Sequence, residues 1–268
     1  MLSRFTLEWR YFLLAVGFFT RVPVPSFTNF KVEDLNHSAK YFPLIGILVG
    51  AVGAGFYLLS ARFLPQTLAV LISMASTIYL TGAFHEDGLA DSADGMGGGW
   101  KREQILTIMQ DSRLGTYGAI AIFLALFVKF ELLSSLSHQL VAYALIMGHA
   151  LSRLSAVWIM ATLHYTKMEG KAKPLATYIN RPDLVLANVL GLLPFLVFIA
   201  YQYAHHGLTQ SLLNVALLTL LPMLLVGVWW HRKINYWLDG YTGDTLGAMQ
   251  QMAEIAFYFG LVLWSMSR

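Results

Sequence analysis

The sequence predicts an all-α integral membrane protein: a polytopic bundle of about seven transmembrane helices, preceded by a short N-terminal interfacial or re-entrant helix. Hydrophobic residues make up 57% of the 268 residues and charged residues only 12%, against about 25% charged in soluble domains. The apolar residues gather into segments of about 20, the length that crosses a bilayer. No polar stretch could form a second unit, so residues 1–268 are predicted to be a single membrane-embedded domain. The absence of cysteine excludes disulfides and thiolate metal sites.

The first apolar segment, residues 11–20, lies between Arg10 and Arg21. It is too short to cross about 30 Å of hydrocarbon and is therefore expected to lie at the membrane surface or to re-enter. Longer segments follow, and the predicted spans are roughly 41–63, 65–84, 114–136, 139–162, 184–203, 211–230 and 245–266. In the first span, Gly46, Gly50 and Ala54 form a stripe of small residues that predicts close helix packing.

The basic residues predict how the spans are oriented. Seven spans place the N-terminal region and the segments 85–113, 163–183 and 231–244 on one side, with 14 of the 18 Lys and Arg residues. The other side would hold only Arg62, Lys129 and Arg268. Basic residues favour cytoplasmic loops, so the first side is predicted to face the cytoplasm. The net charge of +3 is small, and no nucleic-acid partner is predicted.

Residues 85–99, His-Glu-Asp-Gly-Leu-Ala-Asp-Ser-Ala-Asp-Gly-Met-Gly-Gly-Gly, hold the strongest chemical signal. Four of the chain's 15 acidic residues are concentrated there: Glu86, Asp87, Asp91 and Asp94. In a helix, the three aspartates would share one face and repel one another. A divalent cation would offset that repulsion, and Mg²⁺ prefers such oxygen ligands. The segment therefore predicts a metal site, with a solvated acidic loop as the alternative.

The residues around this motif could bind the rest of a substrate. Glycines allow a backbone to approach a ligand closely, and basic residues or a free helix N-terminus suit an anion. The candidate substrate-binding residues are Gly88, Gly95, Lys101, Arg102, Ser112 and Arg113. Asp111 is a candidate metal ligand, although Asp111 or Ser112 could equally well cap the next helix.

Two ionisable residues lie inside the fourth predicted span. His149 and Arg153 are four residues apart and share one helical face. Ionisable groups within a membrane are costly unless they face a partner or a cavity. His149 is either a hydrogen-bonded packing residue or a substrate contact. Arg153 is predicted to pair with a phosphate or an acidic group, and Glu254 in the last span is one candidate partner.

Residues 239–248, Asp-Gly-Tyr-Thr-Gly-Asp-Thr-Leu-Gly-Ala, repeat the pattern of aspartates among glycines at the start of the last span. Asp244 or Thr245 could simply cap that helix. Alternatively, Asp244 adds a carboxylate to the metal site and Thr245 contacts the substrate. Acidic groups for a metal and basic groups for phosphate together predict phosphoryl transfer at the cytoplasmic face.

Residues 84–95, Phe-His-Glu-Asp-Gly-Leu-Ala-Asp-Ser-Ala-Asp-Gly, resemble the signature of the cobalamin synthase, or adenosylcobinamide-GDP ribazoletransferase, family. The resemblance continues in order at 41–46, 111–118, 151–153 and 241–248, over nearly the whole chain. It implies an enzyme of the bacterial inner membrane that completes the nucleotide loop of cobalamin. Adenosylcobinamide-GDP and α-ribazole, or its 5′-phosphate, would give adenosylcobalamin, or its 5′-phosphate, and GMP. The implied cofactor is Mg²⁺. The implied partners are the two substrates and the lipid bilayer, and a homo-oligomer is compatible with the resemblance.

The resemblance also implies roles for the candidate residues. The metal ligands would be Glu86, Asp87, Asp91 and Asp94, completed by Asp244 and Asp111. His85, or an aspartate such as Asp94 that is not committed to metal, would take the proton of the attacking ribose hydroxyl. Arg153 would offset charge on the phosphate.

Two rival functions are less consistent with the sequence. A CDP-alcohol phosphotransferase has the signature Asp-x-x-Asp-Gly-x-x-Ala-Arg, which residues 91–95 match, but Gly98 and Gly99 stand in place of Ala-Arg. A transporter would place its binding residues near the bilayer midplane. Here the carboxylates gather in a segment predicted to be a cytoplasmic loop, so an enzyme is favoured.

Overall fold

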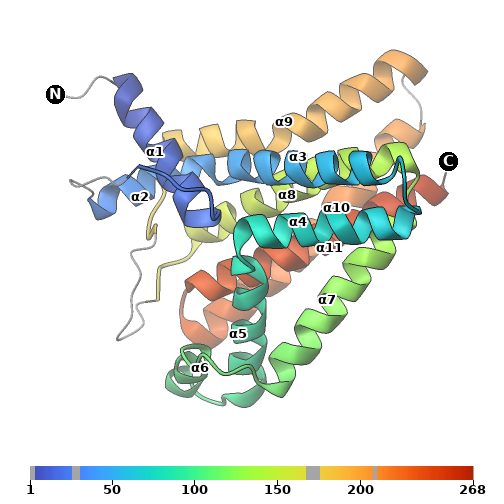
Figure 1. Ribbon diagram of the computed structural model, residues 1–268. Helices are drawn as coiled ribbons and strands as arrows, with labels where there is room; N and C mark the ends of the chain where they lie inside the picture. The colour runs from blue at the N-terminus through green and yellow to red at the C-terminus, as the bar shows by residue number, and fades with distance from the viewer. Residues whose placement is uncertain (1–3, 26–30, 167–175, 208–209, 268) are drawn as a thin grey trace.

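A computed structural model describes residues 4–25, 31–166, 176–207 and 210–267 as a bundle of helices (Figure 1). The helices are α1 (Arg4–Phe19), α2 (Val32–Ser38), the 3₁₀ helix η1 (Ala39–Tyr41), α3 (Phe42–Ser60), α4 (Gln66–Thr81), α5 (Phe84–Gly98), α6 (Arg102–Met109), α7 (Thr116–Ser134), α8 (His138–Thr162), α9 (Arg181–His206), α10 (Gln210–Leu238) and α11 (Gly243–Met266). Within these residues the only β-pairing is an isolated bridge between Tyr165 and Tyr241. The prediction of an all-α fold is confirmed.

Among the described residues, six helices are long and apolar enough to cross a membrane. The pair α4 and α5 becomes a seventh span if it is counted as one element, although it is bent by 85°. In Figure 1, α1 begins on one side of the bundle and α11 ends on the other, as an odd number of crossings requires. The predicted multi-pass membrane protein of about seven spans is therefore confirmed.

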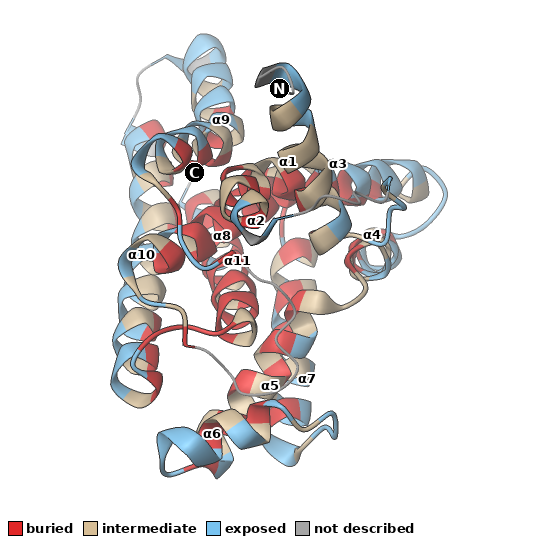
Figure 2. Cartoon of the chain, turned by 90° about the vertical axis from the view of Figure 1, so that its left-hand side faces the viewer, coloured by how far each residue is buried: buried red, intermediate tan, exposed pale blue. Residues whose placement is uncertain are grey.

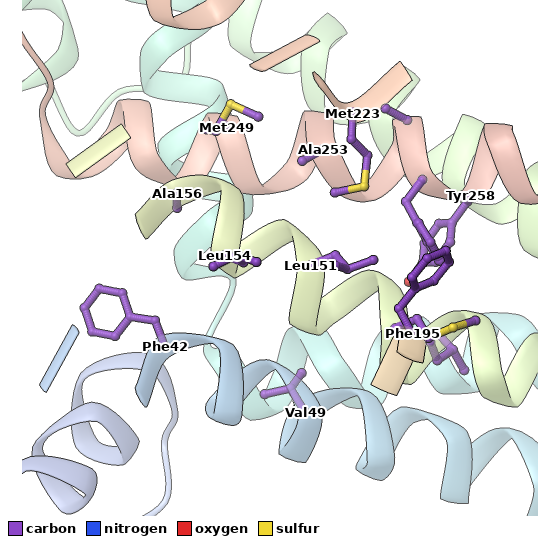
Figure 3. Packing of buried hydrophobic residues seen from close by; sticks show 14 of the residues in the cluster. Phe42, Val49, Leu151, Leu154, Ala156, Phe195, Met223, Met249, Ala253 and Tyr258 are labelled. Carbon is purple, nitrogen blue, oxygen red and sulfur yellow. The ribbon is translucent and has the colours of Figure 1, made fainter. Parts of the chain in front are cut away.

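Two helices form the inside of the bundle. The apolar windows of α8 and α11 are 78% and 72% buried, whereas those of α7, α9 and α10 are each 22% buried. Figure 2 shows the same contrast, with α8 and α11 largely buried and the outer faces of α9 and α10 exposed. Figure 3 shows Leu151 and Leu154 of α8 between Val49 of α3 and Met249 of α11. Polar side chains on α8 and α11 consequently face protein rather than lipid.

The glycine stripe of α3 packs directly against α8. A Cβ atom added to Gly50 would lie 2.6 Å from the backbone oxygen of Leu145, and one added to Gly46 would overlap the backbone of His149. Only glycine allows two helix backbones to approach so closely. The predicted small-residue packing is confirmed.

The first helix, α1, begins at Arg4, whereas the sequence predicted a segment from residue 11. Its charged residues form ion pairs, so they lie within the helix and do not mark its start. In α1, Glu8 forms an ion pair with Lys40 at 2.8 Å and Arg10 with Asp34 at 3.0 Å. Lys40 also contacts Asp183 of α9 at 3.1 Å. These contacts fasten α1 to η1 and α9.

Two segments predicted as loops are helical, and this corrects the sequence analysis. Residues 85–113 contain α5 and α6, because α4 ends at Thr81 and the left-handed residues Gly82 and Ala83 turn the chain into a new helix. The small residues of α5 allow it to pack on α11 despite its polarity. The other segment, 231–244, is mostly α10, which continues to Leu238 because residues 228–239 contain neither proline nor glycine.

Candidate active site

The two aspartate–glycine segments meet where α5 crosses the N-terminal end of α11. A Cβ atom added to Gly88 would lie 2.8 Å from the backbone oxygen of Asp244. A Cβ atom on Gly247 would lie 3.3 Å from the backbone oxygen of His85. The glycines therefore bring the two backbones together, and segments far apart in the sequence form one site.

Three carboxylates gather at this junction, and we call Asp87, Asp91 and Asp244 the acidic cluster. Asp91 interacts electrostatically with Asp244 and Asp87, and Asp244 with Asp87. Asp87 is exposed to solvent, while the other two are half-buried. Among the ion pairs of the described residues, none involves a member of this cluster. The repulsion within the cluster is therefore not offset by an ion pair with a basic side chain.

The chemistry of the cluster fits a Mg²⁺ ion that keeps some water or substrate ligands better than it fits a metal ion whose ligands all come from the protein. No three Asp, Glu or His side chains of the described residues stand close enough together to hold an ion as they are oriented. Mg²⁺ usually binds through one or two carboxylates and completes its shell with water and substrate phosphates. Exposed Asp87 and half-buried Asp91 and Asp244 could supply such a partial shell.

Asp94 has a different environment from these three residues. Its two carboxylate oxygens accept hydrogen bonds from the backbone amides of Gly115 and Gly118, each at 2.8 Å. Asp94 thus satisfies amides at the start of α7, the position that the sequence analysis offered to Asp111, Ser112 or a bound anion. Its predicted roles as metal ligand and proton acceptor stay predictions, and they would require it to leave this position or share its oxygens.

Asp111 and the basic residues near α6 do not join the acidic cluster. The guanidinium of Arg113 contacts Asp111 at 2.6 Å, and its hydrogen bonds lower the pKa of the Asp111 carboxyl to about 2. Ser112, Lys101 and Arg102 are exposed. No contact of the described structure connects these five residues with the cluster, and their roles remain predictions.

Thr245 helps to start α11. Thr242 is the N-cap residue: its hydroxyl accepts the amide of Thr245 at 3.3 Å, and the Thr245 hydroxyl accepts the amide of Thr242 at 2.9 Å. Thr242, rather than Asp244 or Thr245, is therefore the N-cap. This arrangement leaves the Asp244 side chain available for the acidic cluster.

A second polar group lies inside the bundle, and we call Lys129, His149, Gln250, Gln251 and Glu254 the buried network. Glu254 is 1% exposed and contacts Lys129 at 3.0 Å and His149 at 3.2 Å. Gln250 donates to it at 2.7 Å. The assignment of Lys129 to the far side of the membrane was wrong, because Lys129 is buried within α7. Its position well inside an apolar segment was the signal that could have revealed this.

Arg153 of α8 and His85 of α5 are both buried. Arg153 donates to the backbone oxygen of His149 at 3.1 Å and forms no ion pair with Glu254 within the described residues. In the part of the chain that the structure describes, Arg153 Nε and His85 Nε2 find no hydrogen-bond partner. Both line a cavity of about 10 Å³, which is room for about one water molecule. Their predicted contacts with phosphate and with the ribose hydroxyl are not tested by this arrangement.

Glu86 and Tyr165 are placed in ways that the sequence did not indicate. The amide of Gln251 donates to Glu86 at 2.9 Å, so Glu86 faces the buried network. On the other side, burial and the nearby Asp244 carboxylate raise the pKa of Tyr165, whose hydroxyl consequently stays protonated near the cluster. Tyr165 is held there by backbone hydrogen bonds between its neighbours and Tyr241, at 2.8 and 2.9 Å.

Comparison with known proteins identifies the family to which the chain is similar. The sequence model of the cobalamin-5-phosphate synthase family matches residues 11–262. The chain is 45% identical to the adenosylcobinamide-GDP ribazoletransferase of Ralstonia pickettii (strain 12J), over 97% of this chain and 98% of that protein. It is 43% identical to the protein of the same name from Shewanella amazonensis, over 99% and 100% of the two chains. No solved structure matches the chain.

Proposed function

The chain belongs to the cobalamin-5-phosphate synthase family, and from this premise we propose that it joins adenosylcobinamide-GDP to α-ribazole or α-ribazole 5′-phosphate. The products would be adenosylcobalamin, or its 5′-phosphate, and GMP. The observation that supports this reaction most directly is the acidic cluster, whose three carboxylates converge without an ion-pair partner among the described residues. Mg²⁺ would supply the positive charge that this cluster needs, and would at the same time offset the negative charge of the diphosphate.

The proposed transfer is a single displacement at phosphorus. The ribose 3′-hydroxyl of the ribazole attacks the phosphorus that bears the cobinamide arm, and a new P–O bond forms. The bond to the bridging oxygen of the diphosphate breaks, GMP leaves with its electron pair, and the hydroxyl proton passes to a base. Such reactions depend mainly on positioning and on neutralising charge.

Residues of this chain would divide that work. Asp87, Asp91 and Asp244 would hold Mg²⁺, which when bound neutralises the diphosphate oxygens. Tyr165, with its protonated hydroxyl beside Asp244, would donate a hydrogen bond to a phosphate oxygen. The proton acceptor would be His85 or a carboxylate of the motif that is not engaged with metal.

We also propose that the cluster faces the cytoplasm of a bacterial inner membrane. With Lys129 inside α7, only Arg62 and Arg268 of the basic residues are left for the far side, and this strengthens the charge bias. Both substrates would then reach the site without crossing the membrane.

The test uses purified full-length protein in detergent. Adenosylcobinamide-GDP and α-ribazole 5′-phosphate are supplied with Mg²⁺, and the expected result is equal amounts of corrinoid product and GMP. A parallel reaction with α-ribazole measures the preferred acceptor, and a CDP-alcohol with an alcohol acceptor serves as the rival reaction. CMP release in the rival reaction, with no GMP in the first, would overturn the proposal.

A further inference from the structure

The carboxylates of α5 face two different directions. Consecutive residues of a helix are about 100° apart, so Glu86 and Asp87 cannot point the same way. Asp87 and Asp91, four residues apart, share the side that belongs to the acidic cluster. Glu86 instead accepts a hydrogen bond from Gln251 of α11 at 2.9 Å. One carboxylate of the motif is therefore tied to the inside of the protein.

Gln251 itself is held by a cation. The ammonium of Lys129 donates to the side-chain oxygen of Gln251 at 2.7 Å and also contacts Glu254 at 3.0 Å. An ammonium can only donate and a carboxylate can only accept, so the amide of Gln251 has one possible orientation between Lys129 and Glu86. Gln251 is 2% exposed, and water cannot readily replace these bonds. The chain of contacts fixes Glu86 relative to α7 and α11.

We propose that Gln251, oriented by Lys129, is a positioning residue that sets the rotation of α5 and thereby the placement of Asp87 and Asp91. The inference rests on the proposed function. Two left-handed residues, Gly82 and Ala83, join α4 to α5 at an 85° bend. Because the helix does not continue through this bend, α4 does not fix the rotation of α5 about its own axis. The close approach at Gly88 limits the separation of α5 from α11, and Asp94 fastens the far end of α5 to α7.

Small rotations of this helix have large effects on its carboxylates. Side chains end about 5–6 Å from a helix axis, so a rotation of about 20° moves a carboxylate by about 2 Å. Metal–ligand distances are held to within about 0.2 Å. An α5 helix that can rotate by a few degrees would hold Mg²⁺ less tightly, even with every acidic residue present.

The chain offers a matched control for Gln251. Gln250 is the preceding residue, has the same side chain and is also 2% exposed. Its amide donates to Glu254 and Ser152, at 2.7 and 3.4 Å, and forms no hydrogen bond with α5 within the described residues. Gln251→Met should raise at least tenfold the Mg²⁺ concentration that gives half-maximal thermal stabilisation, measured without substrate. The Mg²⁺ concentration that gives half-maximal ribazole transfer should rise by the same factor. Gln250→Met should change neither value more than twofold. Equal shifts in the two variants would overturn the proposal.

Exchanging the side chains of Glu86 and Gln251 tests whether Glu86 only positions α5 or binds the metal directly. In the double variant Glu86→Gln and Gln251→Glu, the new carboxylate accepts from Lys129 and the new amide donates to it from α5. Gln251→Glu alone sets two carboxylates against each other and should weaken Mg²⁺ binding at least tenfold. Glu86→Gln alone keeps an oxygen that accepts from Gln251 and should change Mg²⁺ binding less than threefold, and the double variant should return to within threefold of the wild type. Failure of the double variant to recover, while it remains folded, would assign Glu86 to the metal.

The same measurements distinguish this inference from the proposed function. Wild-type protein that is stabilised by Mg²⁺ but transfers no ribazole would overturn the function and leave the positioning role intact. Wild-type protein that transfers ribazole, but whose unfolding does not respond to Mg²⁺, would overturn the positioning role and leave the function intact.

Discussion

The acidic cluster and the buried network differ in what surrounds their carboxylates. Glu254, at the centre of the network, has Lys129, His149 and Gln250 around it. Among the described residues, the charged groups that act on Asp91 are all carboxylates: Asp244, Asp87 and Asp94. The two groups share α11, and Gln251 of the network contacts Glu86 of α5, so the two groups are close neighbours. A carboxylate that the protein itself compensates stabilises the fold, while one left uncompensated is available to a ligand.

The largest effect expected from this contrast is a loss of stability on Glu254→Gln. The change leaves the buried Lys129 without a carboxylate, and breaking a buried ion pair in this way costs about 3–5 kcal/mol. Thermal unfolding in detergent should show a much lower midpoint. Exchanging both partners, as Glu254→Leu with Lys129→Met, should recover most of the stability, since an apolar pair can replace a buried ion pair. A stable single variant would contradict the comparison.

The next effect is a loss of activity on Asp91→Asn, without a loss of stability. Removing one charge-stabilising group from such a site costs about 10²–10³-fold in turnover, while the change also removes a like charge from the cluster. Release of GMP and the unfolding midpoint should be measured on the same preparation. Activity within tenfold of the wild type, or a clear drop in the midpoint, would assign Asp91 to the fold instead.

A smaller effect should appear on adding metal to the enzyme alone. Mg²⁺ binding to the folded state only, at about 100 times its dissociation constant, stabilises by about 2.7 kcal/mol. The unfolding midpoint of the wild type should rise with Mg²⁺ and fall again with a chelator, whereas that of Asp91→Asn should not respond. An equal rise in the two proteins would place the metal elsewhere.

The smallest effect should come from Asp111→Asn. Asp111 pairs with Arg113 at the surface, and exposed ion pairs contribute about 0–1 kcal/mol. Turnover and the Mg²⁺ concentration for half-maximal activity are both expected to stay within threefold of the wild type. A hundredfold loss of turnover would restore the sequence-based assignment of Asp111 to the metal shell.

The membrane fold could be predicted from the sequence because apolar length is a local property of the chain. Hydropathy identified the spans, and the small residues Gly46 and Gly50 identified one packed face. Hydropathy also misread α5 as a loop, since its polar residues hide a helix stabilised by contacts with other elements. The tilt of α5 is set at Gly82 and Ala83, and alanine gives no sequence signal for a left-handed backbone.

The site could be predicted only in outline. The grouping of Asp87 and Asp91 follows from helical spacing, and the addition of Asp244 from a repeated pattern of residue types. The separation of Glu86 from them depends on Gln251, a contact between distant parts of the chain that no local pattern reveals. The pairing of Asp94 with the start of α7 is likewise a tertiary contact.

The crossing of α5 over α11 also has a consequence for how the protein is made. Most of the chain separates the two helices, and a ribosome synthesises α5 long before α11. Until α11 enters the membrane, α5 lacks Asp244, Gln251 and the backbone against which Gly88 packs. A growing chain therefore cannot assemble the cluster or bind a diphosphate there, and catalytic competence arises only when biogenesis reaches α11.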